Sequence, residues 1–259
     1  GIAAFVRGWF REPPPTFELR APSARWGQSK PRQVRHALRV AEVIRETPST
    51  RTFVLESPDG GAPGFDYRAG QHLTLLVDAG GTTHRRCYSF STSPLAGALP
   101  AITVKRMADG VVSRHLHEHV RAGDTLVSLD PTGEFTLATD ATARRHLVLV
   151  AGGVGITPLV SLAETVLRAE PGSRVTLLCG NRSEDEIVFR RRLESLAQQF
   201  APRLRVRHAL DAAADDWTGQ RGPLDGARVL QALGDAVADA YFVCGPDPMM
   251  QSVCAALEA

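Results

Sequence analysis

The spacing of hydrophobic residues predicts β-strands in the first part of the chain. From residue 36 to about 138, short stretches alternate apolar and polar residues, and turn-forming clusters separate them. Alternation with a period of two is typical of strands with one buried face. We expect strands at 38–40, 52–55, 71–77, 86–90, 101–106 and 125–129. Short strands at this spacing predict a closed or nearly closed antiparallel β-barrel, interrupted by one helix near 113–120.

The pattern changes after residue 139. Continuous apolar runs predict buried strands at 147–151, 175–178, 204–206 and 240–244. Helical stretches lie between them, at 159–168, 184–199 and 227–233. Strands that alternate with helices predict a parallel, Rossmann-like sheet covered on both faces. The expected fold class is β + α/β, with a barrel domain at 36–140 and a parallel-sheet domain at 141–259.

Composition excludes several classes of protein. The 259 residues are 43% hydrophobic, with 30 basic and 28 acidic side chains, which is an ordinary globular composition. The formal net charge of +2 argues against a nucleic-acid-binding protein. No apolar run approaches the roughly 18 residues of a membrane-spanning helix, and no signal-peptide pattern is present. We therefore expect a cytoplasmic protein.

Cysteine and histidine spacing indicates neither a disulfide framework nor a metal site. The four cysteines are dispersed, at Cys87, Cys179, Cys244 and Cys254. This spacing lacks the clustered pattern of a plant-type iron–sulfur site. His115 and His119 lie one helical turn apart, but no third or fourth ligand is indicated. No metal site is predicted in this chain.

The first 35 residues form a basic extension. They carry seven basic and two acidic side chains, with five aromatic residues and a run of three prolines. Such a segment could dock onto a partner or an anionic membrane surface. We favour a solvated extension, because basic termini without a pattern are usually solvated. Membrane contact is conceivable only through this arm or a partner.

A glycine-rich turn follows the first strand of the second domain. It has the pattern G-x-G-x-x-P and leads from a buried strand into a helix. Glycines let a backbone approach a pyrophosphate, and a helix N-terminus offers free N–H groups. A tight turn without a ligand is the alternative. The candidate nucleotide-binding residues are Gly152, Gly153, Gly155, Ile156, Thr157 and Pro158.

The end of the next strand bears on the choice of coenzyme. An NAD-specific site usually has a carboxylate here that binds the ribose hydroxyls. This chain has Asn181, Arg182 and Ser183 instead. Arg182 could pair with a 2′-phosphate, which favours NADPH, although NADH stays possible. The alternative is a solvated arginine, and we expect 190–192 on a solvated face as well.

One strand of the barrel domain carries residues suited to a flavin. Regular alternation places Arg86 and Tyr88 on one face and Cys87 and Ser89 on the other. An arginine can hold a pyrophosphate, and a tyrosine ring can lie against an isoalloxazine. A serine hydroxyl or backbone N–H can reach a flavin ring nitrogen. Taken alone, the strand is better explained as a β-strand with a buried tyrosine.

The start of the barrel's helix offers a second phosphate site. Gly110, Val111, Val112 and Ser113 precede or open this helix, and Ser113 is a good N-cap residue. A helix N-terminus presents free N–H groups to an anion. Two such sites in one chain fit two dinucleotides, of which the second would be FAD.

The last predicted strand ends in Cys244, Gly245 and Pro246. The carboxyl ends of parallel strands line the ligand crevice of such folds. A thiol at this position could lie beside a nicotinamide. A buried cysteine at a strand end is an equally good interpretation of the spacing.

These motifs together resemble the ferredoxin–NADP⁺ reductase superfamily. Four motifs occur in that family's order, namely Arg86-x-Tyr88-Ser89, Gly110-Val111-Val112-Ser113, Gly153-x-Gly155-x-x-Pro158 and Cys244-Gly245-Pro246. The resemblance covers about residues 36–259. It extends to the FAD/NAD(P)H reductase components of multicomponent bacterial oxygenases and desaturases, and to the reductase half of flavohaemoglobins.

The resemblance implies FAD in the barrel and NAD(P)H in the second domain. Arg86 would bind the flavin pyrophosphate, Tyr88 would stack on the ring, and Ser89 would lie near its reactive nitrogen. Cys244 would lie by the hydride path, and with Tyr88 and Ser89 it forms the expected catalytic set. The remaining FAD-binding residues would be Cys87, Thr103, Val104, Lys105, Gly110, Val111, Val112 and Ser113.

The implied function is flavin-dependent electron transfer. Hydride would pass from NAD(P)H to FAD, and single electrons would pass to an iron–sulfur or haem partner in an oxygenase, hydroxylase or desaturase system. A [2Fe–2S] cluster would come only from a further domain or a partner. The chain also lacks the terminal aromatic residue of plant-type members. One alternative is a regulatory FAD-binding subunit without turnover. Another is a structural docking module, which leaves the four motifs unexplained.

Overall fold

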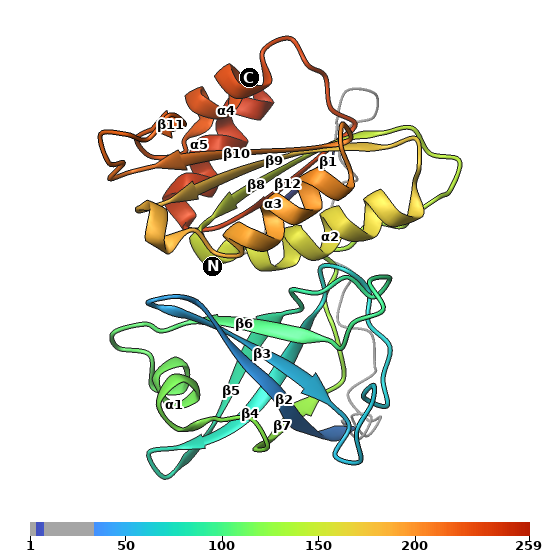
Figure 1. The fold of residues 1–259 in the computed structure, drawn as a ribbon, viewed down its shortest axis with the longest axis vertical. Helices are drawn as coiled ribbons and strands as arrows, with labels where there is room; N and C mark the ends of the chain where they lie inside the picture. Colours follow the sequence, from blue (N-terminus) through green and yellow to red (C-terminus); the bar gives the residue numbers. More distant parts are fainter. Residues whose placement is uncertain (1–3, 8–33) are drawn as a thin grey trace, which may run out of the picture.

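The computed structural model describes residues 4–7 and 34–259 in two parts stacked on each other (Figure 1). An antiparallel sheet forms the lower part in this view, and a largely parallel sheet with helices forms the upper part. Most of the basic extension (1–3 and 8–33) lies outside the described residues, and so does its suggested docking role. The predicted fold class is confirmed.

The lower part is a six-stranded antiparallel barrel. The strand order is β5-β4-β7-β2-β3-β6. The two edge strands meet through a bridge between Phe90 and Ile102, and the Ser91 N–H donates to the Ala101 carbonyl at 2.8 Å. The strands are β2 (Arg35–Thr47), β3 (Thr50–Glu56), β4 (His72–Ala79), β5 (Thr82–Ser89), β6 (Ala101–Lys105) and β7 (Thr125–Leu129).

One helix, α1 (Val111–His119), packs against strands β4 and β6 of the barrel. Leu116 is fully buried and carries the helix into the barrel core beside Phe53 and Leu73. Burial of a leucine side chain of this kind stabilises the fold by roughly 2 kcal/mol. The hydrophobic core therefore fixes where the N-terminus of α1 points.

The upper part is a six-stranded sheet in the order β1-β12-β8-β9-β10-β11. Five strands run parallel, and β1 pairs antiparallel with β12 at one edge. The strands are β1 (Ala4–Arg7), β8 (His146–Gly152), β9 (Arg174–Asn181), β10 (Leu204–Leu210), β11 (Gln220–Arg221) and β12 (Ala240–Cys244).

Helices cover both faces of this sheet. The helices α2 (Ile156–Ala169) and α3 (Arg190–Gln199) lie on the face toward the barrel, and α4 (Gly226–Leu233) and α5 (Asp247–Glu258) lie on the other (Figure 1). All seven residues of β8 are buried because apolar layers cover both faces. Leu147 and Leu149 face the α2 core, whereas Val148 and Val150 face the α5 core.

The predicted helix at 184–199 is wrong in its first half. A single 3₁₀ turn, η2 (Glu184–Glu186), is followed by three consecutive buried apolar residues, Ile187, Val188 and Phe189. Phe189 has φ of 62°, in the left-handed region, and α3 begins only at Arg190. Three adjacent residues cannot share one face of a helix, so their burial in the core overrides the helical pattern.

Three elements were missed by the hydrophobic pattern. Strands β1 and β11 are short and lie at the two edges of the sheet, where only one neighbour specifies them. Helix α5 begins beside Pro246 and Pro248, which are typical turn residues in a sequence. Proline is compatible with the first helical turn, because no intrahelical partner is needed there for its missing N–H.

Candidate functional site

Strand β5 presents the predicted flavin residues on alternating faces, as expected. In the β4–β5 pairing, Tyr88 lies opposite Leu73 and Arg86 opposite Leu75, two core residues. Cys87 lies opposite Thr74 on the other face, with the thiol 3.5 Å from the threonine hydroxyl. Arg86 and Cys87 are exposed. Because Cys87 points away from the face of Tyr88, only its backbone can serve a ligand on that face.

Tyr88 presents an uncharged aromatic surface. Its ring packs against the barrel core but is only partly buried. Burial raises the pKa of Tyr88 to about 12. The phenol therefore stays neutral at physiological pH. A neutral, partly exposed ring fits an aromatic ligand that stacks on it.

The N-terminus of α1 matches the predicted anion site, but Ser113 is not its N-cap. The helix begins at Val111 after Gly110, and the Ser113 hydroxyl lies inside the first turn. This hydroxyl donates to the Gly110 carbonyl at 3.2 Å and accepts the Met107 N–H at 3.1 Å. No described side chain caps the helix, and its first turn holds no acidic residue. Its free N–H groups suit a phosphate.

His117 connects the two flavin-motif elements and was not singled out from the sequence. Its Nε2 lies 2.8 Å from the carbonyl of Val104, so the side chain ties α1 to β6. Burial is the main cause that lowers the pKa of His117. The neighbouring His115 and His119 rings contact each other instead, with centres 5.1 Å apart. Nothing in the sequence distinguishes His117 from the neighbouring histidines, because its partner on β6 is not a neighbour on the helix.

The predicted nucleotide turn forms a 3₁₀ turn, η1 (Gly153–Gly155), that leads into α2. Gly153 has φ of 52°, and a Cβ there would meet nothing within 4 Å, so space lies open before it. Pro158 lies in the first turn of α2, as predicted. The helix start has neither an acidic residue nor a capping side chain among the described residues. This arrangement leaves an open, electropositive helix start.

The Cys244 motif and the glycine turn lie against each other. A Cβ on Gly155 would come within 2.2 Å of the Cys244 carbonyl oxygen, and one on Gly152 within 2.6 Å of Pro246. The two motifs meet because β8 and β12 are parallel neighbours whose carboxyl ends coincide. Glycine is required at these positions by close packing of the protein itself, as well as by any ligand.

The Cys244 side chain is half-buried beside this turn. Burial raises the pKa of its thiol to about 11. The thiol is therefore protonated at physiological pH and cannot act as a thiolate nucleophile. Only a neutral packing or hydrogen-bonding role is open to Cys244.

The glycine turn also contacts the barrel. Turn η1 packs against β6, the strand that carries Thr103, Val104 and Lys105. The Thr103 hydroxyl is buried and bonded to Ser91 and Thr52, so it is not available to a ligand. The structure thus brings the glycine turn, the Cys244 motif and strand β6, which carries three predicted FAD-binding residues, to one boundary between the two parts.

The predicted coenzyme loop lies at the same edge of the sheet, after β9. Asn181 is buried, whereas Arg182 is exposed and its side chain makes no hydrogen bond or ion pair with any described residue. The Ser183 hydroxyl donates to Asp185 at 2.5 Å. Arg182 therefore offers a guanidinium without a protein partner, while Ser183 already has a carboxylate acceptor.

Glu186 links this coenzyme loop to the barrel. Its carboxylate accepts a hydrogen bond from the Ser49 hydroxyl at 2.6 Å and lies 3.7 Å from the Lys105 ammonium. Both partners belong to the barrel, next to β3 and in β6. The sequence offered no pattern that pairs residues so far apart.

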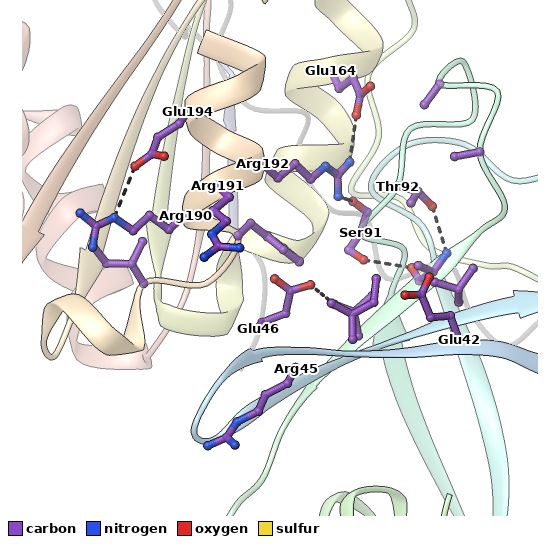
Figure 2. A pocket seen from close by; sticks show the side chains of 18 of the residues that line it. Glu42, Arg45, Glu46, Ser91, Thr92, Glu164, Arg190, Arg191, Arg192 and Glu194 are labelled. Carbon is purple, nitrogen blue, oxygen red and sulfur yellow. Dashed lines mark hydrogen bonds and ion pairs between the residues drawn. The ribbon is translucent and has the colours of Figure 1, made fainter. Parts of the chain in front are cut away.

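A groove of about 1250 Å³ opens between the barrel and α3 (Figure 2). Its walls come from β2, from the segment after β5, and from α2 and α3. None of the four sequence motifs lines it. The groove is therefore separate from the boundary where those motifs meet.

Residues 4–7 and 34–259 contain neither a cluster of metal-ligating side chains nor a helix that could cross a membrane. No three His, Cys, Asp or Glu side chains converge there as metal ligands would. No helix in this part of the chain combines the length and apolar character required to span a bilayer.

Comparison with known proteins assigns each of the two parts of the chain to a protein family. Residues 37–137 match the family described as the oxidoreductase FAD-binding domain. Residues 149–255 match the oxidoreductase NAD-binding domain. These matches cover the barrel and the parallel sheet respectively.

Similar proteins belong to oxygenase systems. The chain is 35% identical to one of the subunits of 1,2-phenylacetyl-CoA epoxidase from Escherichia coli, over 86% of this chain and 64% of that protein. It is 36% identical to the ferredoxin reductase component of 3-ketosteroid-9-alpha-monooxygenase from Rhodococcus rhodochrous, over 85% of this chain and 60% of that protein. The chain thus spans about three fifths of the length of these relatives.

Solved structures agree with this assignment. The FAD/NAD-binding domain of nitric oxide dioxygenase from Vibrio cholerae has a TM-score of 0.73 at 28% identity, covering 86% of this chain and 92% of that one. A cytochrome P450 reductase from Amycolatopsis has a TM-score of 0.73 at 25% identity, covering 87% of this chain and 66% of that one. The chain belongs to the FAD- and NAD-binding oxidoreductases with the ferredoxin reductase fold.

Proposed function

We propose that this chain is the flavin- and nucleotide-binding part of a reductase component that takes reducing equivalents from NAD(P)H. The observation that carries the proposal is the contact of the glycine turn η1 with both Cys244 and strand β6. One nucleotide turn and one flavin strand then share a boundary, as direct transfer between two rings requires. In this proposal, residues 36–140 hold FAD and 141–259 hold the nucleotide.

The donor set of the barrel fits FAD. Arg86 and the uncapped N–H groups of Val111 and Val112 supply positive charge for a pyrophosphate. Tyr88 offers a neutral ring face, and Ser89 lies next to it on the strand. When bound, FAD supplies the exchange between two-electron and one-electron chemistry. The protein's contribution is to hold and orient the ring.

The donor set of the parallel sheet fits a nicotinamide nucleotide. Gly153 leaves space for a close backbone approach, and the start of α2 faces that space with an uncapped N-terminus. Arg182 lies where the adenosine ribose would be bound, and its side chain has no partner among the described residues. An unpaired guanidinium favours a 2′-phosphate, so NADPH is the preferred donor in this proposal and NADH the second.

The electron acceptor in this proposal is an oxygenase or ferredoxin-type partner. Support comes from the relatives, which include a subunit of an epoxidase and the ferredoxin reductase component of a monooxygenase. A [2Fe–2S] cluster would be supplied by a further domain or by the partner. A cytoplasmic location is part of the proposal, because nicotinamide nucleotides are available there.

Anaerobic stopped-flow mixing of the flavin-loaded protein with NADPH, and separately with NADH, tests the function. Loss of the flavin absorbance at about 450 nm would support the function as a reductase, and the donor that reacts faster would identify the preferred coenzyme. A protein that retains FAD but is reduced by neither donor would indicate a regulatory FAD-binding subunit. A protein that does not retain FAD would contradict both functions.

A further inference from the structure

Helix α2 carries a polar stripe on a buried face. Ser161, Glu164 and Thr165 are spaced by three and four residues, so they share one side of the helix. All three are buried, at 0%, 4% and 8% exposure. Polar groups are buried in this way only when they find partners, because an unpaired buried group costs about 1–3 kcal/mol. Some of their partners lie within α2, where Arg168 donates to Glu164 and the Thr165 hydroxyl donates to the Ser161 carbonyl. The other partners lie in the barrel and on α3.

Three successive barrel residues bond to this side of the parallel-sheet part. The Ser161 hydroxyl donates to the Thr92 carbonyl at 2.6 Å, and the Ser93 and Thr165 hydroxyls lie 2.7 Å apart. Arg192 of α3 donates to the Ser91 carbonyl at 2.7 Å. We call these contacts of Ser91, Thr92 and Ser93 the domain seam.

Arg192 is held in place for this contact. Its second guanidinium nitrogen donates to the buried Glu164 carboxylate at 2.9 Å, and its guanidinium lies 5.6 Å from the centre of the Phe189 ring. Figure 2 shows Arg192 reaching from α3 toward both Glu164 and Ser91. The planar fork of an arginine can join two acceptors at a fixed angle, which a lysine cannot.

The domain seam lies a few residues from both cofactor motifs. Ser91 follows Ser89 of β5, the strand with the predicted flavin motif, by two residues. Ser161 follows Pro158 of the nucleotide turn by three. Ser91 is also fastened inside the barrel, where the Thr103 hydroxyl donates to its Oγ at 3.0 Å. A shift at the seam would therefore move the flavin strand relative to the start of α2.

We infer that the domain seam sets the register between the flavin and the nicotinamide, with Arg192 as a positioning residue. This inference rests on the proposed function. Apolar contact alone would let two domains slide, whereas directional hydrogen bonds between partly or fully buried groups fix one arrangement. A displacement of about 1 Å between reacting rings can cost a factor of about 100 in rate.

Two measurements on the flavin-loaded Arg192→Ala protein test the inference. Hydrogen–deuterium exchange at residues 91–93 should accelerate while the barrel core strands stay protected. In stopped flow at saturating NADPH, the limiting rate of flavin reduction should fall about tenfold or more, with nucleotide affinity changed by less than about twofold. The charge-transfer absorbance of the stacked rings should weaken in parallel.

The matched control is Arg191→Ala on the same helix. Arg191 is exposed, and its side chain makes no hydrogen bond or ion pair with any described residue. This variant should retain the parent's limiting rate and exchange pattern. An Arg192→Ala protein that also retains both would overturn the inference. If the parent flavin is not reduced at all, the proposed function fails, and the exchange data still decide whether the seam holds the domains.

Milder variants keep the test valid if Arg192→Ala does not fold. Ser161→Ala removes one seam bond. The Thr92 carbonyl still accepts a hydrogen bond from the Tyr67 hydroxyl at 3.1 Å in this variant. Thr165→Val and Ser93→Ala both remove the bond between the Ser93 and Thr165 hydroxyls. Each also removes one local bond, from the Thr165 hydroxyl to the Ser161 carbonyl or from the Leu95 N–H to the Ser93 hydroxyl. Their effects on the limiting rate should therefore add only in part when combined. Fully additive effects, or unchanged rates in all three single variants, would exclude positioning by the seam.

Discussion

At the scale of single residues, the environments of two candidate side chains restrict what each can do. Cys244 is half-buried with a raised pKa, so it is a neutral thiol. Arg182 is exposed and its side chain is unpaired among the described residues, so its full charge is available to a ligand. Neither property follows from the residue type, since cysteine and arginine at other positions of this chain behave differently.

We expect Arg182→Ala to reduce the preference for NADPH over NADH by about tenfold, the effect of losing one charge-assisted phosphate contact of roughly 1.5 kcal/mol. Steady-state kcat/KM values for the two donors measure the ratio. Arg191→Ala serves as the control, because its exposed side chain lies on the next helix. An unchanged ratio in Arg182→Ala would remove Arg182 from the phosphate site.

The cysteines should differ in their reaction with iodoacetamide. Cys87 is exposed and should be alkylated first. Burial raises the pKa of Cys179 to about 12 and that of Cys244 to about 11, so both should react slowly below about pH 9. The alkylation rate of Cys244 should rise with pH and level off only near pH 11. Peptide mass spectrometry over a pH series measures the rates. Rapid alkylation of Cys244 at neutral pH would contradict a buried, protonated thiol.

At the scale of elements, function depends on how strand ends are packed. Strands β8 and β12 end side by side, and each ends in a motif with glycine. The motifs can touch only because Gly155 has no side chain in front of the Cys244 carbonyl. Similarly, His117 decides how α1 is attached to β6. Each candidate cofactor site is thus built from two elements distant in sequence.

Gly155→Ala should therefore damage the α/β part. Its Cβ would lie 2.2 Å from a backbone oxygen, which forces the two strand ends apart at a cost of about 1–3 kcal/mol. Thermal unfolding measures the loss of stability, and NADP⁺ binding measures whether the displaced strand ends also lower the nucleotide affinity. Gly64→Ala is the control, because a Cβ there would meet nothing within 4 Å. Equal stability and affinity in the two variants would contradict the close approach.

At the scale of the whole molecule, a buried carboxylate anchors the connection between the two parts. Glu170, at the end of α2, accepts hydrogen bonds from Arg145, Ser173 and the Asp140 N–H. Burial raises its pKa, but these donors outweigh burial and hold the pKa below its usual range. The ionised form is therefore the one that the fold stabilises.

Glu170→Gln should cost about 3 kcal/mol of unfolding free energy at neutral pH, because Arg145 loses its buried partner. A carboxyl with a lowered folded pKa stabilises above its unfolded pKa and loses that contribution as the pH falls further. The difference in unfolding free energy between the parent and Glu170→Gln should thus become smaller below about pH 4.5. Urea unfolding at several pH values measures it.

The matched control for Glu170 is Glu118→Gln. Glu118 forms an exposed i,i+4 pair with Arg114, which should contribute less than about 0.5 kcal/mol. A similar loss of stability in both variants, or a Glu170→Gln effect that grows in acid, would show that the Glu170 cluster is not an ionised anchor.

The local hydrophobic pattern was sufficient to predict most of the fold. Period-two stretches and buried runs identified the barrel, the parallel strands and the change between them near residue 139, because each strand or helix records which of its faces is buried. The cofactor motifs were also visible, since a turn such as Gly153–Pro158 must be contiguous to form a helix start. These features depend on neighbours in sequence.

Only the tertiary structure decided the features that depend on contacts between distant residues. The break at Phe189, the meeting of Gly155 with Cys244 and the domain seam are of this kind. Most of their partners come from segments tens of residues apart, and no local period records such a pairing. The sequence by itself therefore determined which candidate cofactor motifs are present, and packing determined how they face one another.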